Sequence, residues 1–158
     1  METATPTGMS FYSILKHTHS GLRWVVLILL IYAIYNAFTK KTKNNFTSSD
    51  KKINLFTLAA VHTQLLIGLS LYSMAGFFSL WSDMGSIMKN SYARHIIVEH
   101  LFGMLIAVIF ITIGYSKSKR ASTPNSKHSK IYGMFLIALI IILASIPWPF
   151  RFAISGWF

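Results

Sequence analysis

The segment RHIIVEH, from Arg94 to His100, places an arginine, two histidines and a carboxylate at the start of a long apolar run. The chain has only four acidic side chains, so the position of Glu99 calls for an explanation. A charged group at bilayer depth costs about 2.5–3.5 kcal/mol, and an ionisable residue inside a span is therefore a candidate for function. We expect Glu99 to pair with Arg23 or Arg94, or to accept a ring N–H from a histidine.

Three histidines are the candidate ligands of a metal or haem: His19, His62 and His100. Haem iron needs one or two imidazoles, and a porphyrin fits between helices where side chains are small, as Gly103 is beside His100. His100 matches the expected depth of His19, or of His17, whereas His62 lies deeper by a turn or more. We expect one haem in a site formed by His19, His100 and His62 and tuned by Glu99 and Arg23. For His62 alone, a hydrogen bond to Ser, Thr or backbone is an equally good interpretation.

Other metal and nucleophile chemistry has weaker support. The pair His95 and Glu99 has the spacing of two ligands on one helix face, but HIIVE lacks the second histidine of a zinc HExxH pattern. A zinc site would need His17 or His19 to converge on the same point. The chain has no cysteine, which removes disulfides and thiolate ligands, and it has no nucleophile elbow.

The elements that must position these residues are transmembrane helices. A helix needs about 20 mostly apolar residues to cross a bilayer. Four segments meet this need: 22–38, 53–73, 96–115 and, with its aromatic flank, 131–146. Unpaired backbone groups cannot face lipid, so these segments predict helices rather than strands. We expect an all-α, integral membrane bundle of four spans that forms a single domain over residues 1–158.

The charges predict the orientation of the bundle. Ten of the fifteen Lys and Arg residues lie in the connections between spans 1 and 2 and between spans 3 and 4. By the positive-inside rule, both connections are cytoplasmic and both termini are outside. The net charge of +11 is therefore explained by basic residues that set the orientation of the bundle and attract the headgroups of a lipid bilayer. We expect no nucleic-acid partner, because the basic residues do not alternate with aromatic ones as a stacking surface would require.

Four segments, HTHSGLRW, VHTQLLIGLSLY, RHIIVEHLFGM and IPWPF, resemble a family of short four-helix bacterial membrane proteins labelled cytochrome-b-like. The resemblance covers His17 to Phe158. It implies a haem b held by histidines in a bacterial inner membrane, passing electrons between a quinol and a partner protein. Its ligands carry over to His100, His62 and His19. The chain departs from di-haem cytochromes b because its fourth span has no histidine, so a second haem is not expected.

A different class of function stays open beside this one. The chain could be a haem-free accessory subunit of a larger membrane or respiratory complex. That hypothesis predicts that Glu99, His100 and Arg23 form one internal network, with no cavity wide enough for a porphyrin. Whether the protein is an enzyme is left open.

Overall fold

The computed structural model describes residues 10–152, which are mostly helical and include no strand. The elements in chain order are α1 Phe11–Lys40, α2 Ser48–Met74, η1 Ser79–Asp83, α3 Met84–Lys89, α4 Ser91–Arg94, η2 His95–Glu99, α5 His100–Arg120 and α6 Pro124–Ser145. The predicted all-α fold is confirmed.

Four helices are long and apolar enough to cross a membrane: Phe11–Lys40, Ser48–Met74, the continuous helix Ser91–Arg120 and Pro124–Ser145. Each contains one of the predicted spans, except that Ile146 follows the end of α6. The chain is therefore a multi-pass membrane protein. Helix α1 begins well before its apolar core, and the side chain of its N-cap, Ser10, accepts a hydrogen bond from the Ser13 backbone N–H at 3.2 Å.

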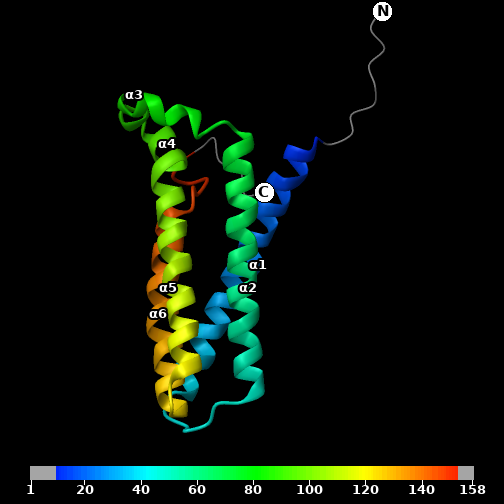
Figure 1. Cartoon of the computed structure of the whole chain (residues 1–158), viewed down its shortest axis with the longest axis vertical. Helices are drawn as coiled ribbons and strands as arrows, with labels where there is room; N and C mark the ends of the chain where they lie inside the picture. The colour runs from blue at the N-terminus through cyan, green and yellow to red at the C-terminus, as the bar shows by residue number, and fades with distance from the viewer. Residues whose placement is uncertain (1–9, 153–158) are drawn as a thin grey trace, which may run out of the picture.

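The four long helices run roughly along one axis, and α1 is inclined to the other three (Figure 1). One end of the bundle carries the α1–α2 and α5–α6 connections with their lysines, and we call it the basic end. The opposite end carries the start of α1, the ends of α2 and α6, and the short elements from η1 to α4. We call it the histidine end, because His17, His19, His95 and His100 lie there.

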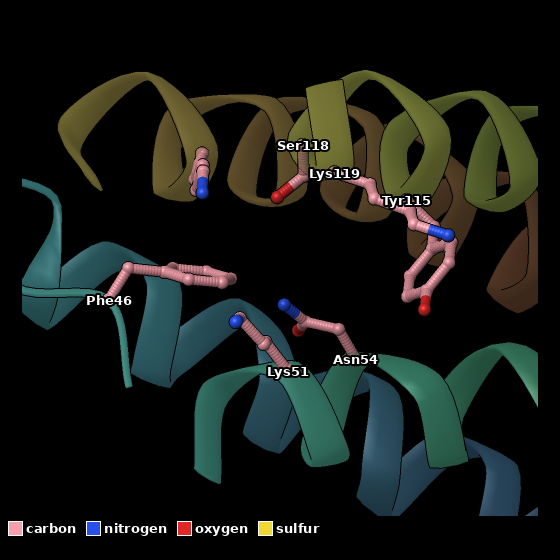
Figure 2. A pocket seen from close by; sticks show the side chains of 7 residues that line it. Phe46, Lys51, Asn54, Tyr115, Ser118 and Lys119 are labelled. Atoms are coloured by element: carbon pink, nitrogen blue, oxygen red, sulfur yellow. The ribbon is translucent and has the colours of Figure 1, made fainter. Parts of the chain in front are cut away.

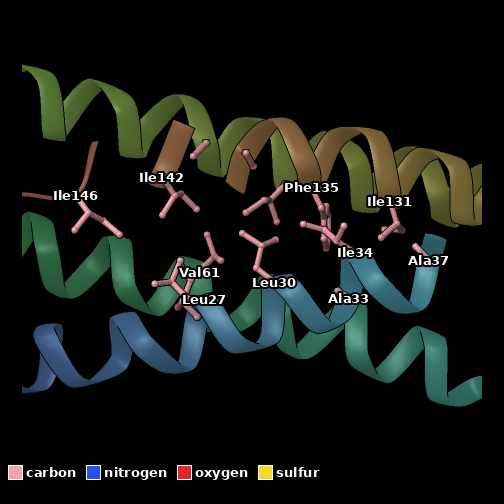
Figure 3. Packing of buried hydrophobic residues seen from close by; sticks show 14 residues of the cluster. Leu27, Leu30, Ala33, Ile34, Ala37, Val61, Ile131, Phe135, Ile142 and Ile146 are labelled. Carbon is pink, nitrogen blue, oxygen red and sulfur yellow. The ribbon is translucent and has the colours of Figure 1, made fainter. Parts of the chain in front are cut away.

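The main hydrophobic core lies between α1, α5 and α6. Its fully buried side chains include Leu30 from α1 and Phe135 from α6 (Figure 3). Ile111 from α5 is fully buried in the same core. Among the described residues, α2 contributes one buried member to this core, Val61. The other buried residues of α2 are Tyr72, in a second cluster, and the polar Asp50, Asn54 and Thr57.

A second, smaller cluster closes the histidine end. It consists of Tyr72, Ile87 and Ile97, which join the end of α2 to α3 and η2. The Tyr72 hydroxyl donates to the Ile97 carbonyl oxygen at 2.9 Å, and the Trp81 indole N–H donates to the Tyr72 oxygen at 2.7 Å. These bonds hold the segment after α2 against the ends of α2 and η2.

Candidate functional site

A cavity of about 620 Å³ lies between α1, α2, α5 and α6 at the histidine end. This volume is typical of small-molecule and cofactor sites, which span roughly 300–1,000 Å³. Its wall is largely apolar, with residues such as Val26, Leu69 and Leu101. The polar groups that line it include His19, Arg23, Gln64 and His100. An apolar cavity with a few converging polar groups is the expected form of a cofactor site.

His100 is held in one tautomer by α6. Its Nδ1 lies 2.8 Å from the Ser145 carbonyl oxygen. A carbonyl oxygen only accepts, so Nδ1 carries the proton and Nε2 keeps its lone pair. The approach of α6 depends on Gly103, since a Cβ there would overlap the Ser145 side chain. Gly103 therefore lets α6 orient the imidazole of His100.

His19 approaches from α1, on the other side of the same cavity. A Cβ added at Gly68 of α2 would lie 3.0 Å from His19 Cε1, so the absence of a side chain there makes room for the ring. Gln64 Nε2 donates to the His19 carbonyl oxygen at 2.8 Å and fixes this part of α1 against α2. The ring nitrogen Nδ1 is buried and has no hydrogen-bond partner among residues 10–152.

The two imidazoles are spaced as a pair of ligands on one metal would be. Their ring centroids are 6.4 Å apart and their planes are inclined by 75°. A ring centre lies about 3 Å from a metal bound to its nitrogen, so two rings on opposite sides of one iron have centres about 6 Å apart. The spacing of His19 and His100 would therefore allow both rings to hold one haem iron.

Arg23 lines the cavity one turn along α1 from His19. Its guanidinium carbon lies 5.4 Å from the centroid of the Trp24 ring. No carboxylate is among the described residues that line the cavity. Arg23 therefore places a guanidinium group at the wall of the cavity.

Glu99 has other partners than Arg23. Its carboxylate accepts from Arg94 Nε at 2.9 Å and lies 2.8 Å from His95 Nδ1, with Arg151 Nη2 at 4.0 Å. Of the alternatives left by the sequence, Arg94 and a histidine both apply. Glu99 is not among the cavity-lining residues that the structure describes.

A π-helical turn explains this separation. The residues His95 to Glu99 form η2, and the His100 backbone N–H donates to the His95 carbonyl oxygen. The extra residue in this turn changes which side chains share a face with the rest of α5. Glu99 stays with Arg94 and His95, while His100 lines the cavity.

His62 lies apart from His19 and His100. Its Nδ1 is 2.8 Å from the Leu58 carbonyl oxygen, and its Nε2 is 3.4 Å from Thr112 Oγ1 of α5. Within residues 10–152, the cavity lining does not include it. The structure thus brings together three of the expected site residues, His19, His100 and Arg23, and leaves His62 and Glu99 outside.

The arrangement of ligands favours haem over a bare metal ion. Among residues 10–152, no group of three or more His, Cys, Asp or Glu side chains is placed to hold a metal. A zinc site needs three or four protein ligands, whereas the porphyrin supplies four of the six ligands of haem iron. Two facing imidazoles are sufficient for haem.

Comparisons with models of protein families, with curated proteins and with solved structures each gave no match. The function is therefore inferred from the side chains of this chain.

Proposed function

We propose that this protein is a membrane cytochrome that holds one haem b between His19 and His100. The observation that carries the proposal is the pair of imidazoles from α1 and α5, 6.4 Å apart, in a cavity of about 620 Å³. When bound, the haem supplies one-electron redox chemistry. Electron exchange with a quinone or a partner protein in a bacterial inner membrane is part of the proposal, and the resemblance of HTHSGLRW and RHIIVEHLFGM to cytochrome-b-like proteins is its support.

The chain's own residues would bind the haem and orient the imidazole that holds it. Ser145 holds the His100 imidazole with its Nε2 lone pair free, which is the common way in which a second hydrogen bond prepares a histidine ligand. The apolar wall excludes water, and a low-dielectric surrounding of this kind tunes redox potential.

The proposal is tested by a reduced-minus-oxidised visible spectrum of the protein purified in mild detergent from haem-replete cells. We expect a sharp b-type α band at about one haem per chain. His100→Ala and His19→Ala should each lose most of this band, because each removes an axial ligand. His62→Ala is the matched control and should keep it, since that ring bonds to Leu58 and Thr112 outside the cavity.

Two results would overturn the proposal. One is a flat spectrum from folded wild-type protein. The other is full haem occupancy in both His100→Ala and His19→Ala. Helical circular dichroism and elution volume should be unchanged in every variant, so that a lost band reports lost ligation and not a lost fold.

The accessory-subunit hypothesis has less support. It requires Glu99, His100 and Arg23 to form one network with no wide cavity between the helices. Glu99 instead binds Arg94 and His95, and a cavity of about 620 Å³ lies beside His100.

A further inference from the structure

A second pocket, of about 220 Å³, lies at the basic end of the bundle (Figure 2). It is lined by Phe46 from the α1–α2 connection, by Lys51 and Asn54 from α2, by Tyr115, Ser118 and Lys119 from α5, and by Lys127 from α6. Lys51 and Lys119 are exposed, so the pocket reaches the surface. It is separate from the cavity that contains His19 and His100.

The charges around this pocket are all positive. Lys51, Lys119 and Lys127 bring three ammonium groups from three different helices, and no described lining residue is acidic. The neighbouring carboxylate, Asp50, is fully buried and already accepts from Lys40 and from Asn36 of α1. The pocket therefore has a surplus of cations that the described part of the chain does not neutralise.

Uncharged donors complete the lining. Asn54 and Ser118 are each only 3% exposed. Figure 2 shows the Asn54 amide and the Ser118 hydroxyl directed into the space between α2 and α5. The Asn54 oxygen is buried without a hydrogen-bond partner among residues 10–152, and because it is an acceptor it suits a lysine ammonium group and not an anion. The uncharged donors left for an anion are the Asn54 Nδ2 amide group and the Ser118 hydroxyl.

The positions of two lysines also favour an anion. Lys51 and Lys127 are within the first four residues of α2 and α6, where the helix macrodipole is positive and cations are disfavoured. A group that carries negative charge and several acceptor oxygens would offset this repulsion and accept from the ammonium, amide and hydroxyl donors together. A phosphate has that chemistry.

We propose that the pocket at the basic end binds the phosphate of an anionic phospholipid headgroup. The pocket lies where α2 and α5 leave the apolar part of their spans, and the same helices expose Leu55, Phe56 and Ile113 on the apolar side of it. Basic pockets between transmembrane helices on the positively charged side of a membrane are suited to such headgroups. A lipid can thus place its phosphate among the lysines while its acyl chains cover the exposed apolar side chains.

Native mass spectrometry of the purified protein in a neutral detergent tests this proposal. The probes are phosphatidylglycerol, phosphatidylcholine and inorganic phosphate, each titrated separately. We expect one phosphatidylglycerol to bind with saturation, at least tenfold more tightly than phosphatidylcholine. The double variant Lys51→Gln/Lys127→Gln should weaken the binding of phosphatidylglycerol at least tenfold.

The matched control is Lys43→Gln/Lys130→Gln, which removes the same charge from exposed positions at the same end but outside the pocket. It should bind phosphatidylglycerol within about twofold of wild type. If both double variants lost the same amount of phosphatidylglycerol binding, the lipid would be attracted to the basic end as a whole, and the proposed site would be overturned. If inorganic phosphate bound in a lysine-dependent way and phosphatidylglycerol did not bind, the proposal that the bound phosphate belongs to a lipid would be overturned. Ser118→Ala, which keeps every charge, should weaken binding several-fold and provides a second readout if the lysine variant fails to fold.

Discussion

At the scale of single residues, the most completely bonded acidic group of the described chain is Asp50. The sequence places it in a polar connection and predicts turn material there. In the structure it is fully buried. It accepts from Lys40 Nζ and Asn36 Nδ2, each at 2.7 Å, and it completes a capping box with Thr47 at the start of α2. One carboxylate thus fixes the first turn of α2 to the last turns of α1.

Asp50→Asn should destabilise the protein. The amide removes the charge partner of Lys40 and places donors where only acceptors fit, and hydrogen bonds to a charged group are worth roughly 1.5–3 kcal/mol each. We expect a loss of about 2–3 kcal/mol, seen as a lower midpoint of thermal unfolding in detergent by circular dichroism. Asp83→Asn is the control, because Asp83 is an exposed N-cap with one bond, to Ser86 N at 3.4 Å. Equal shifts in the two variants would contradict the role given to Asp50.

The sequence predicts which residue types form the candidate site, but not the direction in which each side chain points. Depth along a span follows from the sequence, which matches His100 with His19 or His17, and in the structure His19 and His100 line one cavity. The partner of Glu99 was left open between Arg23 and Arg94, because the π-turn that separates Glu99 from the cavity leaves no clear pattern in HIIVE. His128, which lies among the lysines of the second basic connection in the sequence, is buried in α6, with its Nε2 2.8 Å from the Asn45 carbonyl oxygen.

At the scale of elements, two glycines set how closely α5 and α6 approach. A Cβ at Gly103 would overlap the Ser145 side chain, and a Cβ at Gly114 would lie 2.6 Å from Met134 Cβ. Small residues at such contacts let transmembrane helices pack closely. The sequence predicts that Gly103 allows close approach by a helix or a flat ligand. The structure shows that α6 occupies that side.

Gly103→Ala should therefore separate α6 from α5, even though alanine favours helix by about 1 kcal/mol over glycine. We expect a lower unfolding midpoint and also weaker haem binding, because the Ser145 carbonyl would lose its bond to His100. Gly133→Ala is the control, since its Cβ would meet nothing within 4 Å, and it should be neutral or stabilising. The unfolding midpoint of both variants is measured by thermal unfolding, and their haem content by reduced-minus-oxidised spectra. A Gly103→Ala protein as stable as Gly133→Ala, with full haem, would contradict this account.

At the scale of the whole molecule, the spans were predictable and their packing was not. Bilayer thickness fixes the length of an apolar helix, so hydropathy alone locates four of them. The hydropathy of a span does not indicate which neighbours it touches, since lipid-facing and buried side chains are both apolar. The room for the His19 ring beside α2, for example, depends on the missing side chain at Gly68, which hydropathy does not reveal.

The lysine distribution makes a prediction about the orientation of the whole bundle. The positive-inside rule places the basic end in the cytoplasm and the histidine end outside. Because the chain has no cysteine, single cysteines can report this directly. Ser82→Cys lies in η1, at an exposed site of the histidine end. We expect a membrane-impermeant maleimide to label this cysteine in intact bacterial cells. With Thr42→Cys or Ser122→Cys, in the two basic connections, we expect labelling only after the cells are lysed.

The comparison of the three positions contains its own controls. All three side chains are exposed, so each should label fully in lysed cells, and a failure there would mark poor expression rather than orientation. If Thr42→Cys and Ser122→Cys were labelled in intact cells and Ser82→Cys were protected, the bundle would have the opposite orientation. The cavity lined by His19 and His100 would then lie toward the cytoplasm and the lysine pocket toward the outer leaflet. The expected orientation instead places the lysines at the cytoplasmic leaflet, whose anionic lipids attract basic groups.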